Sequence, residues 1–178
     1  MRRRRARVPA IAAISIVALL GGAGGASARV SPSDRGRTVS PSKDLWTTIN
    51  VCDTVGHPDG IGIRGSMPGS GDRREQMFMR FQVQYFDGRL QQWHNTGPDG
   101  DSGFLAVGSA RFRVRESGRT FTITPPVSGS YLLRGVVTFE WRQGSAVVRH
   151  ARKRTAAGHG GTVGSDPTGF TAATCEIT

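Results

Sequence analysis

Two stretches of the chain alternate apolar and polar residues, and this pattern constrains the fold more than any other feature. Within residues 75–88 (EQMFMRFQVQYFDG) and 129–144 (GSYLLRGVVTFEWRQG), every second position from 77 to 85 and from 131 to 141 is apolar or aromatic, apart from one glycine. Successive side chains point to opposite faces of a β-strand, whereas a helix would scatter such a set around its axis. Each stretch therefore predicts a strand with one buried face. The buried sets are Met77, Met79, Phe81, Val83 and Tyr85, and Tyr131, Leu133, Val137, Phe139 and Trp141.

Shorter runs of the same kind fill most of the remaining chain. They start at Leu45, Ile61, Leu90, Gly103, Arg111, Arg119, Ala146 and Thr171. Turn-forming pairs separate them at Asp87-Gly88, Ser117-Gly118 and Gln143-Gly144, and the last pair predicts a hairpin. With no helical pattern between the runs, we expect an all-β fold of two packed antiparallel sheets. An immunoglobulin-like or fibronectin-like sandwich is the expected topology, and a jelly roll is the alternative.

The first 28 residues have the three-part order of a secretory signal peptide. Five arginines precede an apolar run from Val8 to Leu20, and Ala26-Ser27-Ala28 offers a cleavage site after Ala28. The apolar run is shorter than the roughly 20 residues needed to span a bilayer, so we expect a secreted protein without a stable membrane span. The secretory route, general or twin-arginine, stays open.

The residues after this segment change character at about position 44. Residues 29–43 repeat Val-Ser-Pro-Ser between charged residues and predict a disordered linker. Residues 44–178 carry the alternating runs and predict one sandwich domain.

The charge of the chain favours anionic partners. The formal net charge is +11, and residues 1–28 contain five arginines and no acid, so the remaining residues keep +6. A positive surface attracts wall polymers, phospholipid headgroups or nucleic acid. A purely compositional origin is the alternative, because only Lys43 and Lys153 are lysines and the excess of Arg, Ala and Gly is what GC-rich codons produce.

Cys52 and Cys175 are the only cysteines. An exported chain with two cysteines predicts one disulfide, which would join the first and the last strand of the domain. The pair lacks the spacing of a zinc site.

A resemblance to a known group rests on three stretches. These are residues 125–137 (PPVSGSYLLRGVV), residues 51–69 (VCDTVGHPDGIGIRGSMPG) and residues 134–141 (RGVVTFEW). Together with the signal peptide, they make the chain resemble small uncharacterised secreted proteins of actinobacteria with an immunoglobulin-like sandwich domain. The resemblance implies the fold and carries no activity. Antibody-type domains have a cysteine pair in the middle of the sandwich, so here the disulfide should tie edge or terminal strands.

Two clusters of cationic residues are the candidate binding site. Arg111, Arg113 and Arg115 alternate along one run, and Arg149, Arg152, Lys153 and Arg154 follow the predicted hairpin. If both lie in one sheet, they form a patch for phosphate, carboxylate or sulfate groups. The alternative is a solvated face whose charges prevent sheets from associating. No motif for specific recognition of nucleic acid is present.

The stretch 97–103 (GPDGDSG) offers the candidate for catalysis. Ser102 stands in a sequence typical of serine-protease nucleophiles, and His57 and Asp72 or Asp87 precede it. The spacing argues against a protease, because only 45 residues separate His57 from Ser102 and Phe104 replaces a glycine of the motif.

Asp99 and Asp101 are weak calcium candidates, because the next alternate position is a glycine and no glutamate closes the loop. Turn formation explains the stretch most simply.

The four histidines, His57, His94, His150 and His159, have no metal-ligand spacing, and we expect no cofactor. The sequence therefore favours an exported, non-catalytic module in or near the cell envelope, with anionic polymers or surface proteins as partners. A small secreted hydrolase that uses Ser102 or the carboxylates of Asp99 and Asp101, and a calcium-binding surface domain, are the alternatives.

Overall fold

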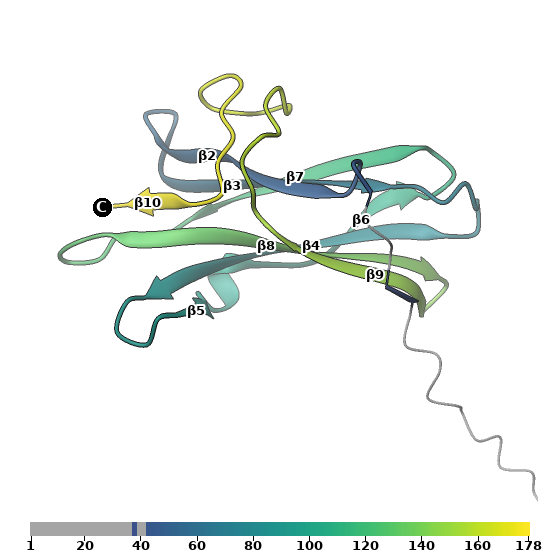
Figure 1. The fold of residues 1–178 in the computed structure, drawn as a ribbon, viewed down its shortest axis with the longest axis horizontal. Coiled ribbons are helices and arrows are strands. Elements are labelled where there is room, and N and C mark those ends of the chain that lie inside the picture. The colour runs from purple at the N-terminus through teal and green to yellow at the C-terminus, as the bar shows by residue number, and fades with distance from the viewer. Residues whose placement is uncertain (1–36, 39–41) are drawn as a thin grey trace, which may run out of the picture. The chain divides into compact units, whose positions relative to one another are not determined.

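A computed structural model describes residues 37–38 and 42–178 (Figure 1). These residues form β-strands and one 3-10 turn, with no α-helix among them. The expected signal peptide, residues 1–28, lies outside the described residues. The strands are β1 (Arg37–Thr38), β2 (Trp46–Thr54), β3 (His57–Pro68), β4 (Gln76–Asp87), β5 (Gln92–Asn95), β6 (Asp101–Ser109), β7 (Val114–Thr122), β8 (Tyr131–Gln143), β9 (Ala146–Arg154) and β10 (Cys175–Ile177), and the turn is η2 (Pro98–Gly100).

The strands form two stacked sheets, so the prediction of an all-β sandwich is confirmed (Figure 1). Sheet A has the order β1-β9-β8-β4-β5, with β10 paired to β8 and β6 paired to β4, and sheet B has the order β2-β3-β7. Immunoglobulin domains place strands A, B and E in one sheet and C, F and G in the other. Taken in chain order, β2, β3 and β7 correspond to A, B and E, and β4, β8 and β9 to C, F and G. The strand order is therefore immunoglobulin-like rather than that of a jelly roll.

The core lies between the sheets, where the alternating pattern places it. β4 and β8 pair antiparallel, with Met79 opposite Phe139 and Phe81 opposite Val137. The predicted buried faces are confirmed except at the strand ends, where Tyr85 is half-buried and Tyr131 is exposed. Sheet B supplies the opposing apolar layer. Its fully or almost fully buried side chains are Ile49, Val51, Ile61, Ile63 and Met67.

Gly135 interrupts the apolar row of β8 because neighbouring side chains leave no room for a Cβ atom there. A Cβ atom at this position would lie 2.6 Å from Cγ2 of Thr155 and 2.8 Å from Cδ1 of Ile63. The Gly135 N–H also donates a hydrogen bond to Oγ1 of Thr155 (3.0 Å). Glycine in a strand commonly marks such a close approach.

A disulfide joins Cys52 of β2 to Cys175 of β10, as the sequence predicts. The Cα atoms are 5.5 Å apart, and 123 positions separate the residues in sequence. Because β2 is an edge strand of sheet B and β10 pairs with β8 of sheet A, the bond links the two sheets through edge and terminal strands.

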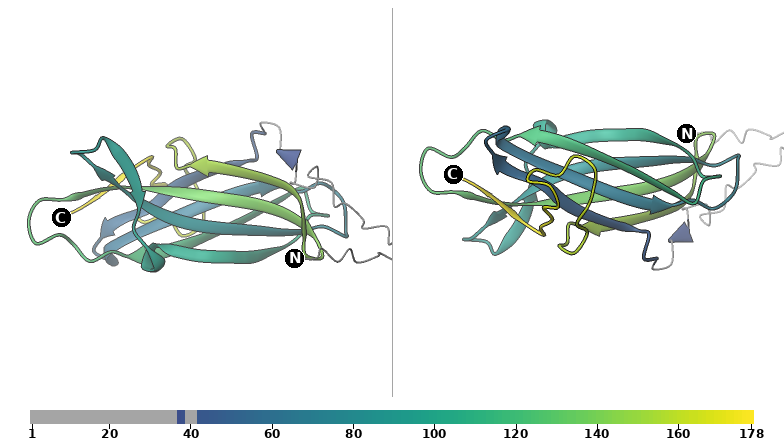
Figure 2. Two further views of the ribbon diagram at one scale, coloured as in Figure 1. Left: turned by 90° about the horizontal axis from the view of Figure 1, so that it is seen from below. Right: turned by 90° about the horizontal axis from the view of Figure 1, so that it is seen from above.

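The connection between β9 and β10, residues 155–174, runs along β2 (Figure 2). The Ala156 N–H donates to the carbonyl of Thr47, and Ile49 and Ala172 exchange two backbone hydrogen bonds of 3.0 Å. Asn50 donates through Nδ2 to the carbonyl of Gly164 (2.8 Å). These hydrogen bonds join residues 155–174 to the side of β2 that does not pair with β3.

Two sequence expectations for residues 111–122 are wrong. Ser117-Gly118 was expected to form a turn, but both residues lie inside β7, with Gly118 paired to Arg64 of β3. A Cβ atom on Gly118 would lie 2.9 Å from the carbonyl oxygen of Ile63, so this glycine allows close backbone approach rather than a turn. The strand expected from Arg111 begins only at Val114.

The N-terminal part of the described chain adds one short element. Within the expected linker, residues 29–43, Arg37–Thr38 forms β1 and pairs in parallel with Arg149–His150 of β9. Strands β2 to β10 all lie within the expected domain, residues 44–178. No helix in the described part of the chain has the length and apolar character needed to cross a membrane.

Candidate anion-binding site

A pocket of about 420 Å³ lies on the face of sheet A that points away from the core. Three adjacent strands supply its lining. The register places Gln84 of β4 beside Arg134 of β8, and Val136 of β8 beside Arg154 of β9. We call this site the basic pocket. Its lining residues are Gln84, Arg134, Val136, Arg152, Lys153 and Arg154.

Arg134 is held in place by its neighbours. Its Nε donates a hydrogen bond to Oε1 of Gln84 (2.9 Å), and Nε2 of Gln84 donates to Oδ1 of Asn95 on β5 (2.9 Å). The guanidinium carbon lies 4.1 Å from the centroid of the Trp93 ring, within cation–π range. Gln84 accepts a hydrogen bond only from the Nε–H of Arg134. The two terminal NH₂ groups of the guanidinium therefore keep their donors for a ligand.

The charges around the pocket are not balanced by acids. No described carboxylate forms an ion pair with Arg134, Arg152 or Arg154. Burial lowers the pKa of Arg134, and the positive charges of Arg154 and Arg152 lower it further. Glu140, on the same face of β8, is bound by Arg142 instead, with 2.6 Å between Nη2 and Oε2. A bound anion would relieve the repulsion between these guanidinium groups.

The first predicted cluster lies elsewhere. Arg111 and Arg113 precede β7, and Arg115 belongs to β7 in sheet B, whereas Arg152, Lys153 and Arg154 belong to β9 in sheet A. The guanidinium carbons of Arg111 and Arg115 lie 4.4 and 4.1 Å from the centroid of the Phe112 ring. The two clusters therefore do not share a sheet, which was the condition for a single patch.

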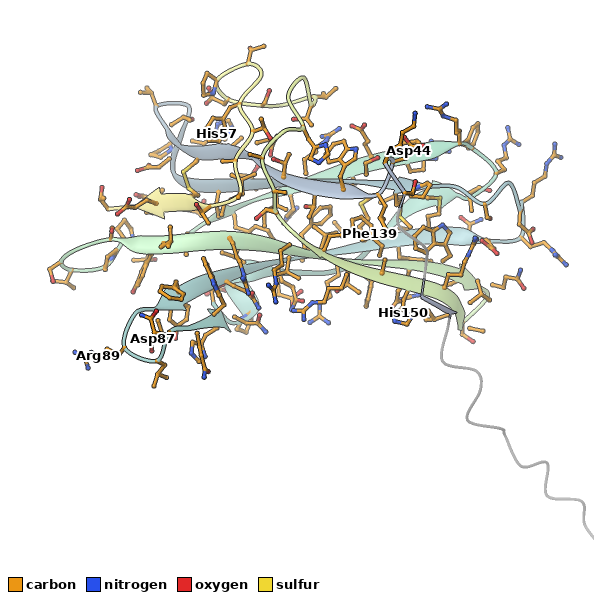
Figure 3. All side chains as sticks on the ribbon, in the orientation of Figure 1. Asp44, His57, Asp87, Arg89, Phe139 and His150 are labelled. Carbon is orange, nitrogen blue, oxygen red and sulfur yellow. A yellow bond between two sulfur atoms is a disulfide. The ribbon has the colours of Figure 1, made fainter. Side chains whose placement is uncertain are left out.

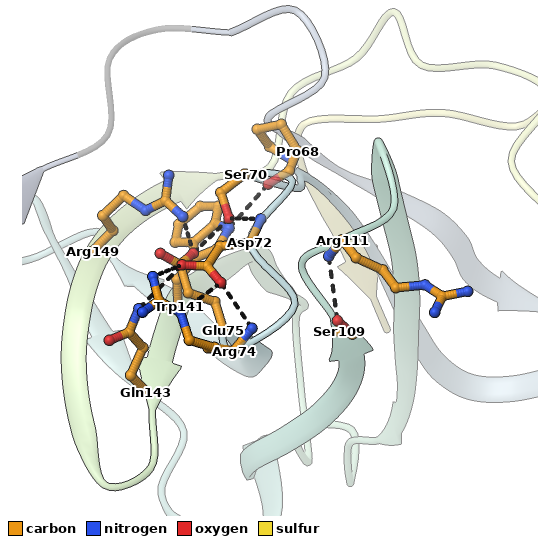
Figure 4. Close-up of polar contacts among 10 residues, drawn as sticks. All are labelled: Pro68, Ser70, Asp72, Arg74, Glu75, Ser109, Arg111, Trp141, Gln143 and Arg149. Atoms are coloured by element: carbon orange, nitrogen blue, oxygen red, sulfur yellow. Dashed lines mark hydrogen bonds and ion pairs between the residues drawn. The ribbon is translucent and has the colours of Figure 1, made fainter.

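Arg149 contacts an acid rather than the pocket. Its Nη2 forms an ion pair with Oε2 of the buried Glu75, which also accepts a hydrogen bond from Oγ of Ser70 (2.7 Å) (Figure 4). The guanidinium carbon lies 5.4 Å from the centroid of the Trp141 ring. Arg149 thus ties β9 to the β3–β4 connection, and we do not assign it to the basic pocket.

Ser102 is engaged in local structure. It lies in β6, where its Oγ accepts a hydrogen bond from the backbone N–H of Phe81 (2.9 Å) and donates to the carbonyl of Gly103 (2.7 Å). No histidine of the described chain forms a hydrogen bond with it. His57 instead lies 3.2 Å from Asp166, measured from Nδ1 to Oδ2, at the β2–β3 hairpin. Figure 3 shows His57 beside the upper sheet and His150 beside the lower sheet, far from each other.

The two calcium candidates have different surroundings. Arg80 pairs with the Asp101 carboxylate and lowers its pKa, and Gln82 donates to it through Nε2 (2.9 Å). The Gly103 N–H also donates to Asp101 (2.9 Å). Asp99 lies in η2 and is exposed. Within the described residues, no group of three or more His, Cys, Asp or Glu side chains could hold a metal ion.

Calcium is expected to leave the melting temperature unchanged to within about 1 °C, because a ligand stabilises only a fold that binds it. The Asp101 oxygens are already used by Arg80, Gln82 and Gly103. The measurement is thermal unfolding followed by circular dichroism, with excess calcium and with a chelator. A rise that the chelator reverses would contradict this expectation.

Sequence reasoning placed Arg134 on the polar face of its strand but not in the site, and it missed Gln84, Trp93 and Asn95 as supports. The signal that identifies them is the pairing of Gln84 with both Arg134 and Asn95, which requires the strand register.

The fold and the pocket define a disulfide-linked β-sandwich with a cationic site on one sheet face. No protein-family model and no curated protein matches the chain.

Proposed function

We propose that the protein is an exported, non-catalytic module that binds anionic polymers in or near the cell envelope through the basic pocket. The observation that carries the proposal is the pocket itself, where Arg134 is fixed by Gln84 and Trp93 and no described acid pairs with Arg134, Arg152 or Arg154. Export is proposed from the pattern of residues 1–28.

Arginine suits this role because its planar guanidinium can donate two parallel hydrogen bonds to one phosphate, carboxylate or sulfate group. An arginine that is already oriented loses little conformational freedom when a ligand binds. Arg134 meets this condition, because its stacking on Trp93 and its bond to Gln84 fix both the plane and the direction of the guanidinium.

The arrangement along β9 favours a polymer over a single small anion. His150, Arg152 and Arg154 occupy alternate positions of one strand, so their side chains leave the same face. Alternate residues lie about 6.5–7 Å apart along a strand, so successive charged groups of an extended polymer can meet successive side chains. The net charge of +6 after residue 28 adds long-range attraction.

Binding of polyphosphate, polygalacturonate and neutral dextran to the intact chain tests the proposal. We expect both anionic polymers to bind and dextran not to bind, with the affinity for polyphosphate falling steeply as salt rises.

Arg134→Gln is expected to weaken polyphosphate binding about tenfold, the size of one lost charge-assisted hydrogen bond. Arg152→Gln combined with Arg154→Gln is expected to lower the salt slope by about one for each lost phosphate contact. Isothermal titration calorimetry at several salt concentrations measures both quantities.

The control variant, Arg111→Gln with Arg113→Gln, removes the same charge from the β6–β7 connection, outside the pocket. It is expected to weaken binding less than twofold. If it weakens binding as much as the β9 double variant does, attraction is due to net charge alone and the proposed site is wrong.

A further inference from the structure

A second pocket, of about 440 Å³, lies where β4 ends and β8 begins, and residues of both sheets line it. From sheet A come Tyr85, Tyr131 and Leu133, and Ile123 and Thr124 follow β7 of sheet B. Asp99 of η2 also lines the pocket. We call this site the interlayer pocket. It shares no lining residue with the basic pocket.

The inner part of the interlayer pocket is apolar and aromatic. Leu133 is fully buried, and Tyr85 and Ile123 are half-buried against the core. The rings of Tyr85 and Tyr131 are tilted by 51° to each other, with centroids 6.3 Å apart. Neither tyrosine hydroxyl has a hydrogen-bond partner among the described residues. A ligand therefore finds two aromatic rings, an apolar floor and free hydroxyl groups.

Among the described residues, Asp99 is the only charged one that lines this pocket. Asp99 is followed by the buried Gly100, where a Cβ atom would lie 1.9 Å from Oγ1 of Thr96. Arg80 pairs with Asp101 rather than with Asp99, and no other described cation forms an ion pair with Asp99. The pocket thus combines aromatic rings with one carboxylate that has no counter-charge in the described chain.

We propose that the interlayer pocket binds a small organic cation, with its ammonium group beside Asp99 and its hydrocarbon part between Tyr85, Tyr131 and Leu133. A carboxylate attracts the charge directly, and the faces of tyrosine rings attract ammonium groups through cation–π interactions. The volume lies within the range of small-molecule sites, which are typically apolar with a few polar groups that set orientation. This site stands independently of the polymer-binding proposal.

Three probes of nearly equal shape test the charge preference at pH 7. They are 2-phenylethylamine, which is cationic, 2-phenylethanol, which is neutral, and phenylacetate, which is anionic. We expect the amine to bind with a Kd of roughly 1 mM, ordinary for a ligand of this size. The alcohol is expected to bind about fivefold more weakly, and the acid more weakly still. Backbone amide shifts in a nitrogen-15 NMR titration of the intact, disulfide-bonded chain report affinity and location.

Two variants separate the roles of the charge and the ring. Asp99→Asn is expected to weaken binding of the amine about fivefold and to leave the alcohol unchanged, because it removes only the ion pair. Tyr131→Leu is expected to weaken both probes, because it removes the ring. Both residues are exposed, so both variants should fold. The matched control is Asp44→Asn, which removes the same charge from a residue that does not line the interlayer pocket.

The proposal is overturned if the amine and the alcohol bind equally and Asp99→Asn changes neither. It is also overturned if methyl glucoside binds more tightly than the amine, which would make this a pocket for neutral sugars. Absence of shifts in residues 96–100 and 122–133 with every probe would mean that the pocket binds no ligand of this size.

Discussion

Replacing Cys52 and Cys175 by alanine is expected to lower the free energy of unfolding by about 4 kcal/mol. The bond closes a loop with 123 positions between its ends, and a crosslink of this length removes much of the conformational freedom of the unfolded chain. In the folded state, it fixes the three-residue strand β10 to β2 of the opposite sheet. Urea unfolding of the wild type and of the double variant measures the difference, together with the m-value.

The wild type in excess dithiothreitol is the control, because reduction removes the crosslink without changing the composition. We expect the reduced wild type and the double variant to unfold at similar urea concentrations, both below the oxidised protein. The amides of Cys175–Ile177 should also exchange faster with solvent in both, because β10 then keeps only its short pairing with β8 and the packing of its side chains. An unchanged midpoint after reduction would show that packing alone holds β10.

The sequence predicted the parts of the fold that depend on strand geometry alone. Burial alternates along β4 and β8 as expected because successive side chains of any strand point to opposite faces. The disulfide was predictable because a chain with two cysteines has one possible pairing. The β7 strand was divided wrongly at Ser117-Gly118 because local sequence cannot tell a turn glycine from one that lets a neighbouring backbone approach.

The candidate site was less predictable, because it depends on which strands are neighbours. The regular spacing of Arg111, Arg113 and Arg115 suggested a strand face, yet the chain enters β7 only at Val114, and this strand lies in the other sheet from β9. Gln84 and Arg134 stand 50 positions apart and meet only through the register of β4 with β8. Charge patterns identified cationic residues along the chain, whereas the strand order determines which of them lie together.

Replacing Arg149 by methionine is expected to lower the free energy of unfolding by about 3 kcal/mol. Glu75 is 8% exposed, and its carboxylate would lose its only cationic partner in the described chain while staying buried. The hydrogen bond from Ser70 remains and compensates in part. Glu75→Gln should cost less, about 1 kcal/mol, because Arg149 is partly exposed and water can solvate its charge. Urea unfolding measures both variants.

The double variant Arg149→Met with Glu75→Gln separates the two contributions. It is expected to be more stable than Arg149→Met alone, because no uncompensated buried carboxylate then remains at position 75. It should also bind polyphosphate nearly as well as the wild type does, because the pair lies outside the basic pocket. Strictly additive losses of stability would mean that the two side chains do not interact. A strong loss of polyphosphate binding in the folded double variant would instead place Arg149 in the binding surface, because the remaining cations of β9 would then be insufficient.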